Sequence, residues 1–98
     1  MIHVIADIRI RPGLLEEFAA IAQPCIAASR REPGCRRYDL NASITDPDAL
    51  VFVEQWESRE AFEAHRTTAH HAAFSQANKP FIVASQVSII HPDKVEVI

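Results

Sequence analysis

The sequence predicts an α+β fold of the ferredoxin-like, split βαβ type, in which one antiparallel four-stranded sheet carries helices on one face. Two observations lead to this class. Segments that alternate apolar and polar residues, typical of strands, and segments with helical spacing follow one another in the order βα, ββ, αβ. The chain has 98 residues, enough for one hydrophobic core, so we expect a single domain over residues 1–98.

The first third of the chain predicts a strand followed by a helix. Residues 2–10 alternate with one strongly apolar side, as in a strand with one buried face. Pro12 and Gly13 end this strand, and apolar residues at helical spacing then continue over residues 14–31. Pro24 lies within that helix. We expect it to kink the helix without ending it, because the apolar stripe continues beyond it.

The middle of the chain predicts an antiparallel hairpin. We expect strands at residues 35–44 and 49–57, joined by four residues that favour turns. Alternation places Arg36 and Tyr38 on one face of the first strand. In the second strand it places three residues on one face: Phe52, Glu54 and Trp56.

The next segment predicts two short helices, each with its own start signal. Ser58 is a suitable N-cap for a helix whose apolar side carries Phe62 and His65. The Thr67–Thr68 pair offers a second N-cap, so a new helix is expected to begin there.

The second of these helices carries a histidine pair, and a long strand follows it. Helical spacing places His70 and Phe74 on the inward side and directs His71 and Ser75 elsewhere, so His71 is expected to be exposed. Residues 81–91 then form a long apolar strand.

One face of the predicted sheet lacks a cover within the chain. Ile5, Val51 and Val53 fall on the face opposite the helices. A second copy of the sheet is the simplest cover, so we expect a homodimer. The C-terminal residues 95–98 alternate weakly and are expected to pair with a partner chain.

Composition and charge argue against several classes of function. The net charge is −3 and the basic residues are scattered apart from two Arg pairs, so nucleic-acid binding is not expected. Cys25 and Cys35 are too few for a disulfide framework and match no metal-binding spacing, so we expect free thiols. The sequence lacks a signal-peptide pattern and a membrane-spanning apolar run, so we expect a cytoplasmic protein with no membrane partner.

Four segments carry a family resemblance: VIADIRIRPG (4–13), EPGCRRYDL (32–40), VEQWES (53–58) and AHRTTAHHAAF (64–74). They resemble the antibiotic biosynthesis monooxygenase-like family, and its small quinol monooxygenases most closely. A Glu-x-Trp pattern at a strand end, followed by a helix that bears a His, is fairly specific to this family. It is far less specific to any one reaction.

The resemblance implies a dimeric α+β barrel, with a pocket in each subunit between its sheet and its helices. Many members oxidise hydroxyaromatic substrates with O2 and use no flavin, haem or metal. Other relatives degrade haem, and another isomerises a phosphorylated sugar. Ala6 stands where haem degraders carry a ligand-orienting Asn, and their iron-binding His is absent near Ser75, so haem degradation is not expected. Arg36 is a further departure, since relatives usually carry an aliphatic residue there.

Glu54 is the first candidate for a catalytic role. On an apolar pocket wall the pKa of its carboxyl group would be raised, which suits a general base or a donor. The alternative is an ion pair with an arginine, such as Arg36 or one of a partner subunit. Trp56 shares its face and offers a flat surface for an aromatic substrate, the alternative being a core Trp. Three phenylalanines are expected to wall the same pocket: Phe52, Phe62 and Phe74.

His65 and His70 are the candidate bases that would take a phenolic proton from the substrate. His65 lies near the end of its helix, so the alternative is a histidine that caps carbonyl groups. The two histidines are five residues apart across a break, which is not the i, i+4 spacing of a zinc pair, so no metal is expected. Tyr38 is a candidate donor to a substrate oxygen, the alternative being simple packing.

Three functions fit these candidates. The first is a cofactor-independent monooxygenase that uses O2 to oxidise a quinol-like or anthrone-like substrate stacked on Trp56. The second is an isomerase of a small phosphorylated or keto metabolite, which moves protons with His65 and Glu54. The third is a dimer that binds a ligand without catalysis. The largely apolar strand at 2–10 favours aromatic ligands over phosphates and therefore the first function.

Overall fold

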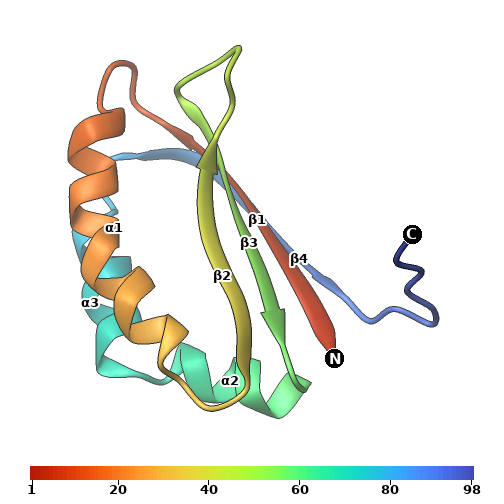
Figure 1. Cartoon of the computed structure of the whole chain (residues 1–98). Coiled ribbons are helices and arrows are strands. Elements are labelled where there is room, and N and C mark those ends of the chain that lie inside the picture. The colour runs from red at the N-terminus through yellow and green to blue at the C-terminus, as the bar shows by residue number, and fades with distance from the viewer.

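The computed structural model describes residues 1–98 and contains four strands and three helices in the predicted order (Figure 1). The elements are β1 (Ile2–Ile10), α1 (Leu15–Arg30), β2 (Cys35–Ala42), β3 (Ala49–Trp56), α2 (Arg59–Arg66), α3 (Ala69–Ala77) and β4 (Ile82–Ile90). The strands and α1 end within two residues of their predicted bounds. The order of elements read from the sequence is therefore confirmed.

The four strands form one antiparallel sheet in the order β2-β3-β1-β4, and all three helices lie over one of its faces (Figure 1). In the register, Val4 of β1 and Tyr38 of β2 flank Glu54 of β3. This is the split βαβ arrangement, so the predicted fold class is confirmed. The central strands β1 and β3 turn alternate residues towards the helices, which makes that face of the sheet the wall of a site.

The hydrophobic core fills the space between the sheet and α1. Val4 and Trp56 point from the sheet into this space, and Phe18 of α1 is wholly buried against them. The Phe18 ring meets the rings of Phe74 and Phe81 edge to face, with centroids 5.8 and 5.9 Å apart. This contact fixes α3 beside α1.

A bulge in β2 overturns one prediction. Cys35 pairs with Trp56 but Arg37 already pairs with Gln55, so Arg36 is an extra residue in the strand. The Arg36 side chain is exposed, whereas Tyr38 is buried on the helix side. The prediction that these two residues share a face is wrong, because the bulge shifts the alternation by one position.

Side-chain caps set where α2 and α3 begin. Ser58 Oγ accepts a hydrogen bond from the backbone N–H of Ala61 at 3.1 Å, and Thr68 Oγ1 accepts one from the N–H of His71 at 3.2 Å. Both predicted N-caps are therefore confirmed. Helix α1 continues through Pro24, as expected from its apolar stripe.

The face of the sheet opposite the helices carries Ile5, Val51 and Val53, each of them half-buried. Residues 91–98 form no strand and lead away from the sheet (Figure 1). Pairing of this tail with a partner chain stays a prediction. None of the three helices combines the length and the apolar character that a membrane crossing requires.

Candidate active site

A cavity of about 700 Å³ lies between the helix-covered face of the sheet and helices α2 and α3. Eighteen residues line it, and ten of them are hydrophobic. The three phenylalanines predicted to wall a pocket all line it: Phe52, Phe62 and Phe74. A concave and mostly apolar space with a few polar groups is typical of sites for small aromatic molecules.

Four polar residues at this cavity come from four different elements. Tyr38 of β2 and Glu54 of β3 are cross-strand neighbours, while His65 of α2 and His71 of α3 approach from the helices. The His65 ring lies 5.4 Å from the Tyr38 ring and 5.0 Å from the His71 ring, measured between centroids. An acid, a phenol and two imidazoles thus lie along one apolar space.

Glu54 is only 6% exposed, and burial raises the pKa of its carboxyl group from 4.5 to about 7. The indole N–H of Trp56 donates to Glu54 Oε1 at 3.0 Å and partly opposes that rise, because it stabilises the charged form. The suggested ion pair with Arg36 is wrong, since Arg36 pairs with Glu57 at 2.9 Å. Glu54 therefore has a buried carboxyl group that changes charge near neutral pH.

Trp56 does not line the cavity, and its side chain is wholly buried. The prediction that it offers a stacking surface to a substrate is wrong in this respect, because α2 and its aromatic residues cover the indole. The His65 ring lies 4.7 Å from the Trp56 ring and the Phe62 ring 6.2 Å from it. Trp56 is instead the packing support behind Glu54 and His65.

His65 lines the cavity, although its side chain is only 2% exposed. Its Nδ1 lies 2.6 Å from Glu32 Oε2, and its Nε2 has no partner in the protein. No fully buried polar side-chain atom lacks a partner, so Nε2 is not fully buried. Burial lowers the pKa of His65, and the neighbouring Glu32 carboxylate opposes this effect.

The alternative in which His65 caps its own helix is wrong. The hydroxyl groups of Thr67 and Thr68 donate to the carbonyl oxygens of Ala64 and His65, each at 2.8 Å. These two threonines satisfy the last turn of α2, so the His65 ring is free for other contacts.

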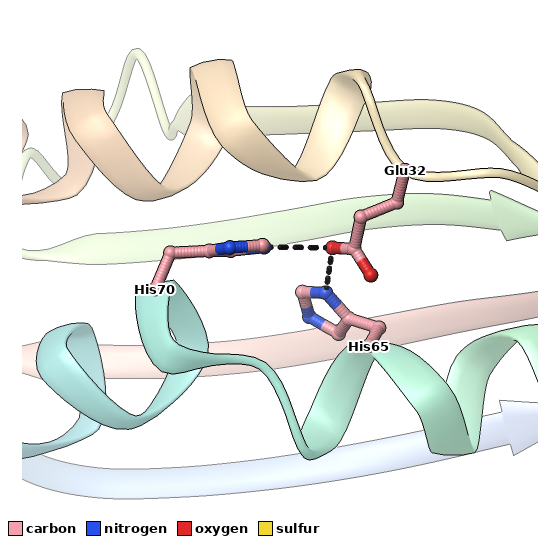
Figure 2. A group of neighbouring side chains, drawn as sticks. All are labelled: Glu32, His65 and His70. Atoms are coloured by element: carbon pink, nitrogen blue, oxygen red, sulfur yellow. Dashed lines mark hydrogen bonds and ion pairs between the residues drawn. The ribbon is translucent and has the colours of Figure 1, made fainter.

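The structure reverses the predicted roles of the next two histidines. His71 is half-buried and lines the cavity, as does Ser75, whereas His70 does not. His70 Nε2 instead lies 2.8 Å from Glu32 Oε2 (Figure 2). The prediction that His71 is exposed is therefore wrong, whereas His70 is half-buried but turned to Glu32 and does not line the cavity. The pKa of His71 is lowered, first by burial and then by its cationic neighbours.

Tyr38 packs in the core and also lines the cavity, and its role as a donor to a substrate oxygen stays a prediction. Its hydroxyl group lies 3.9 Å from Cys25 Sγ, and its ring centroid lies 5.5 Å from that of Phe52. Burial, helped by the Glu54 charge, raises the pKa of Tyr38 above its usual range. The phenol therefore stays protonated near neutral pH and is able to donate.

Glu32 is the site residue that the sequence did not indicate. It follows α1 in the loop before β2, and its side chain is 11% exposed. Together with His65 and His70 it offers three ligand atoms within 4.8 Å of one another, a donor set that suits Zn²⁺ or a related metal. The spacing argument against a metal pair did not include this third residue, and the absence of a metal stays a prediction.

Comparisons with known proteins agree with this fold. Residues 1–77 match the family model for antibiotic biosynthesis monooxygenase. YgiN of Escherichia coli K12, named as a probable quinol monooxygenase, is 36% identical over 94% of this chain and 98% of its own. Among solved structures, PA3566 from Pseudomonas aeruginosa has a TM-score of 0.85 at 30% identity, with 93% of this chain and 92% of its own covered.

Rv0793 from Mycobacterium tuberculosis is a second solved structure of the same shape. It has a TM-score of 0.87 at 28% identity and covers 98% of both chains. The match of the family model extends from β1 through α3, which includes Glu32, Glu54, His65 and His71. The chain therefore belongs to the antibiotic biosynthesis monooxygenase family.

Proposed function

We propose that this protein is a cofactor-independent monooxygenase that oxidises a hydroxyaromatic substrate, quinol-like or anthrone-like, with O2. The observation that carries the proposal is an apolar cavity of about 700 Å³ lined by His65, whose Nε2 makes no hydrogen bond within the protein. The name of YgiN as a probable quinol monooxygenase supports the same class of substrate.

His65 acts as the base in this proposal. Its Nε2 takes the phenolic or carbon-bound proton of the substrate, and the lowered pKa keeps the imidazole neutral and ready to accept it. The resulting anion is electron-rich and reduces O2 directly. For an anthrone, the CH2 group becomes C=O, the second oxygen atom leaves as water, and the substrate supplies all four electrons.

Tyr38 and Glu54 orient the oxygen atoms of the substrate. The Tyr38 hydroxyl group stays protonated and donates to a substrate oxygen as negative charge develops there. Glu54, with a pKa of about 7, donates when protonated and accepts when ionised. The aromatic substrate packs on Phe52, Phe62 and Phe74, which line the cavity in place of Trp56.

The dimer and the cellular location belong to the same proposal. A second copy of the sheet covers the face that carries Ile5, Val51 and Val53. The two free thiols, of which Cys25 is buried and Cys35 half-buried, suit the reducing cytoplasm.

An isomerase of a small phosphorylated metabolite is the second candidate function. One observation favours it: Arg66 and Lys79 both line the cavity, and Lys79 has no acidic partner within ion-pair distance. His65 and Glu54 would then move a proton between two carbon atoms of the substrate.

Oxygen uptake separates these candidates. Protein treated with a chelator is mixed with menadiol-like and anthrone substrates, and O2 consumption is followed with an electrode. The proposal expects O2 uptake above the uncatalysed rate without added flavin, haem or metal. Exchange of substrate protons with solvent, with no O2 uptake, would establish the isomerase instead. Saturable binding of a substrate without either reaction would indicate the third function, ligand binding without catalysis.

A further inference from the structure

We infer that Glu32 is the positioning residue of the site: it fixes the tautomer and the direction of the His65 ring, while His70 holds the Glu32 carboxylate in place. This inference rests on the proposed role of His65 as the base. Its geometric core is one oxygen atom, Glu32 Oε2, which lies 2.6 Å from His65 Nδ1 and 2.8 Å from His70 Nε2 (Figure 2).

An ionised carboxylate accepts hydrogen bonds and has none to donate. Both imidazole nitrogens that face Oε2 must therefore carry their protons. For neutral His65 this places the hydrogen on Nδ1 and leaves the lone pair on Nε2, which makes no hydrogen bond within the protein. The carboxylate thus selects the tautomer that a base facing the cavity requires.

The packing around His65 prevents the ring from turning over. The Trp56 ring lies 4.7 Å away and the Phe62 ring 6.2 Å away with its plane nearly parallel. Rotating the imidazole by half a turn would break the bond to Glu32 inside this aromatic surrounding and leave a buried carboxylate with one partner fewer. Ring direction and tautomer are therefore set together.

Glu32 is well placed for this role because no Arg or Lys side chain competes with the two histidines for its carboxylate. No Arg or Lys lies within ion-pair distance of Glu32, and its recorded partners are the two histidines. The fold brings the three residues together from three places, namely the loop after α1, the end of α2 and the start of α3 (Figure 2). Two donors on one oxygen atom hold a long side chain that would otherwise rotate freely.

The first test reads the tautomer directly. In protein labelled with ¹⁵N and treated with a chelator, the side-chain nitrogen spectrum of the histidines reports which ring nitrogen carries hydrogen. The inference expects neutral His65 in the Nδ1–H form. An Nε2–H form in the wild-type protein would overturn it. This reading needs no substrate, so it stands or fails apart from the monooxygenase proposal.

The second test removes the acceptor. In Glu32→Ala, His65 should become a mixture of tautomers, and with a menadiol-like substrate kcat should fall about 10-fold to 100-fold with little change in KM. The apparent pKa of the base should also fall, because the neighbouring carboxylate no longer raises it. Tyr38 and His71 contact the His65 ring, and Glu54, Arg66 and Lys79 line the same cavity; the variant leaves these titratable groups unchanged.

A matched control variant and a check for a bound metal ion complete the design. Glu57→Gln changes an exposed carboxylate that pairs with Arg36, and it should leave the His65 tautomer and kcat as in wild type. If Glu32→Ala kept the wild-type tautomer and pH profile, the inference would be rejected. Before chelation, the nitrogen spectrum also shows whether His65 and His70 bind a metal. If both gave metal-bound signals that disappear on chelation, the three residues would form a metal site and the inference would be rejected.

Discussion

The Glu54 carboxyl group makes stability depend on pH in a direction opposite to that of most acids. Its folded-state pKa of about 7 lies above the ordinary 4.5, so the folded protein holds an extra proton between these values. Its contribution to stability is therefore fully present below pH 4.5 and is lost as pH rises to 7. The pKa of His65 is lowered, so this residue acts in the other direction. The folded protein loses stability as pH falls below 6.5, the ordinary pKa of histidine, because the unfolded state takes up the proton first.

Glu54→Gln isolates the first of these effects. Between pH 4.5 and 7.5 the free energy of unfolding of the wild type should fall by about 3 kcal/mol relative to the variant, because burial raises the pKa of Glu54 from 4.5 to about 7. Urea unfolding at a series of pH values measures this difference. Two parallel stability curves would show that Glu54 has an ordinary pKa in the folded protein.

The inward direction of Glu54 and Phe52 was predictable because alternation in β3 is unbroken and has a period of two. Which of His70 and His71 lines the cavity was not predictable, because both are half-buried on a helix of nine residues and the contact of His70 with Glu32 depends on tertiary packing. Glu32 gave no local signal. It meets His65 and His70 only through tertiary packing, across 33 and 38 residues of chain.

Among the structural elements, the loop between α1 and β2 depends on a glycine with two constraints. Gly34 has φ of +84°, and a Cβ atom there would lie 2.8 Å from Ala61 Cβ on α2. Gly13 has a similar φ of +78° but nothing within 4 Å of an added Cβ. The two positions therefore share a backbone constraint and differ in the space available.

Gly34→Ala and Gly13→Ala form a matched pair. Each should lose about 1–2 kcal/mol of stability from the left-handed backbone, and Gly34→Ala should lose about 1–3 kcal/mol more because the loop must move away from α2. Urea unfolding of both variants at one pH gives the comparison. Equal losses would mean that the loop does not pack tightly against α2.

Bounds of the elements were predictable where caps and prolines mark them, as Ser58 does for α2. The bulge in β2 was not, because nothing in CRRYDL distinguishes an inserted residue from a regular strand. Tyr38 still points inward because its pairing with Glu54 resumes after the bulge. The error is therefore confined to Arg36 and does not change the site.

At the scale of the whole molecule, the uncovered sheet face predicts self-association. Val53 lies near the middle of that face, so Val53→Asp should convert a dimer into monomers by placing a charge in the interface. Sedimentation velocity at micromolar concentration measures the mass. Ala73→Asp, an exposed position on α3, is the control and should remain dimeric. A monomeric wild-type protein would contradict the proposed dimer.

The architecture was predictable because each segment has its own periodicity and the order βα, ββ, αβ leaves few alternatives. The set of residues that line the cavity was not predictable, since it combines residues from every strand and from two helices. The sequence indicated which types of side chain face inward. The contacts among them required the assembled fold.

The most direct test of the proposed function is O2 uptake by His65→Asn. Asn keeps a donor near the position of Nδ1 and hence the contact with Glu32, but it lacks the Nε2 base. With a menadiol-like or anthrone substrate, wild-type protein treated with a chelator should consume O2, and the variant should be slower by about 100-fold or more. His91→Ala, an exposed histidine outside the cavity, should match the wild type. Equal rates for His65→Asn and the wild type would contradict the role of His65.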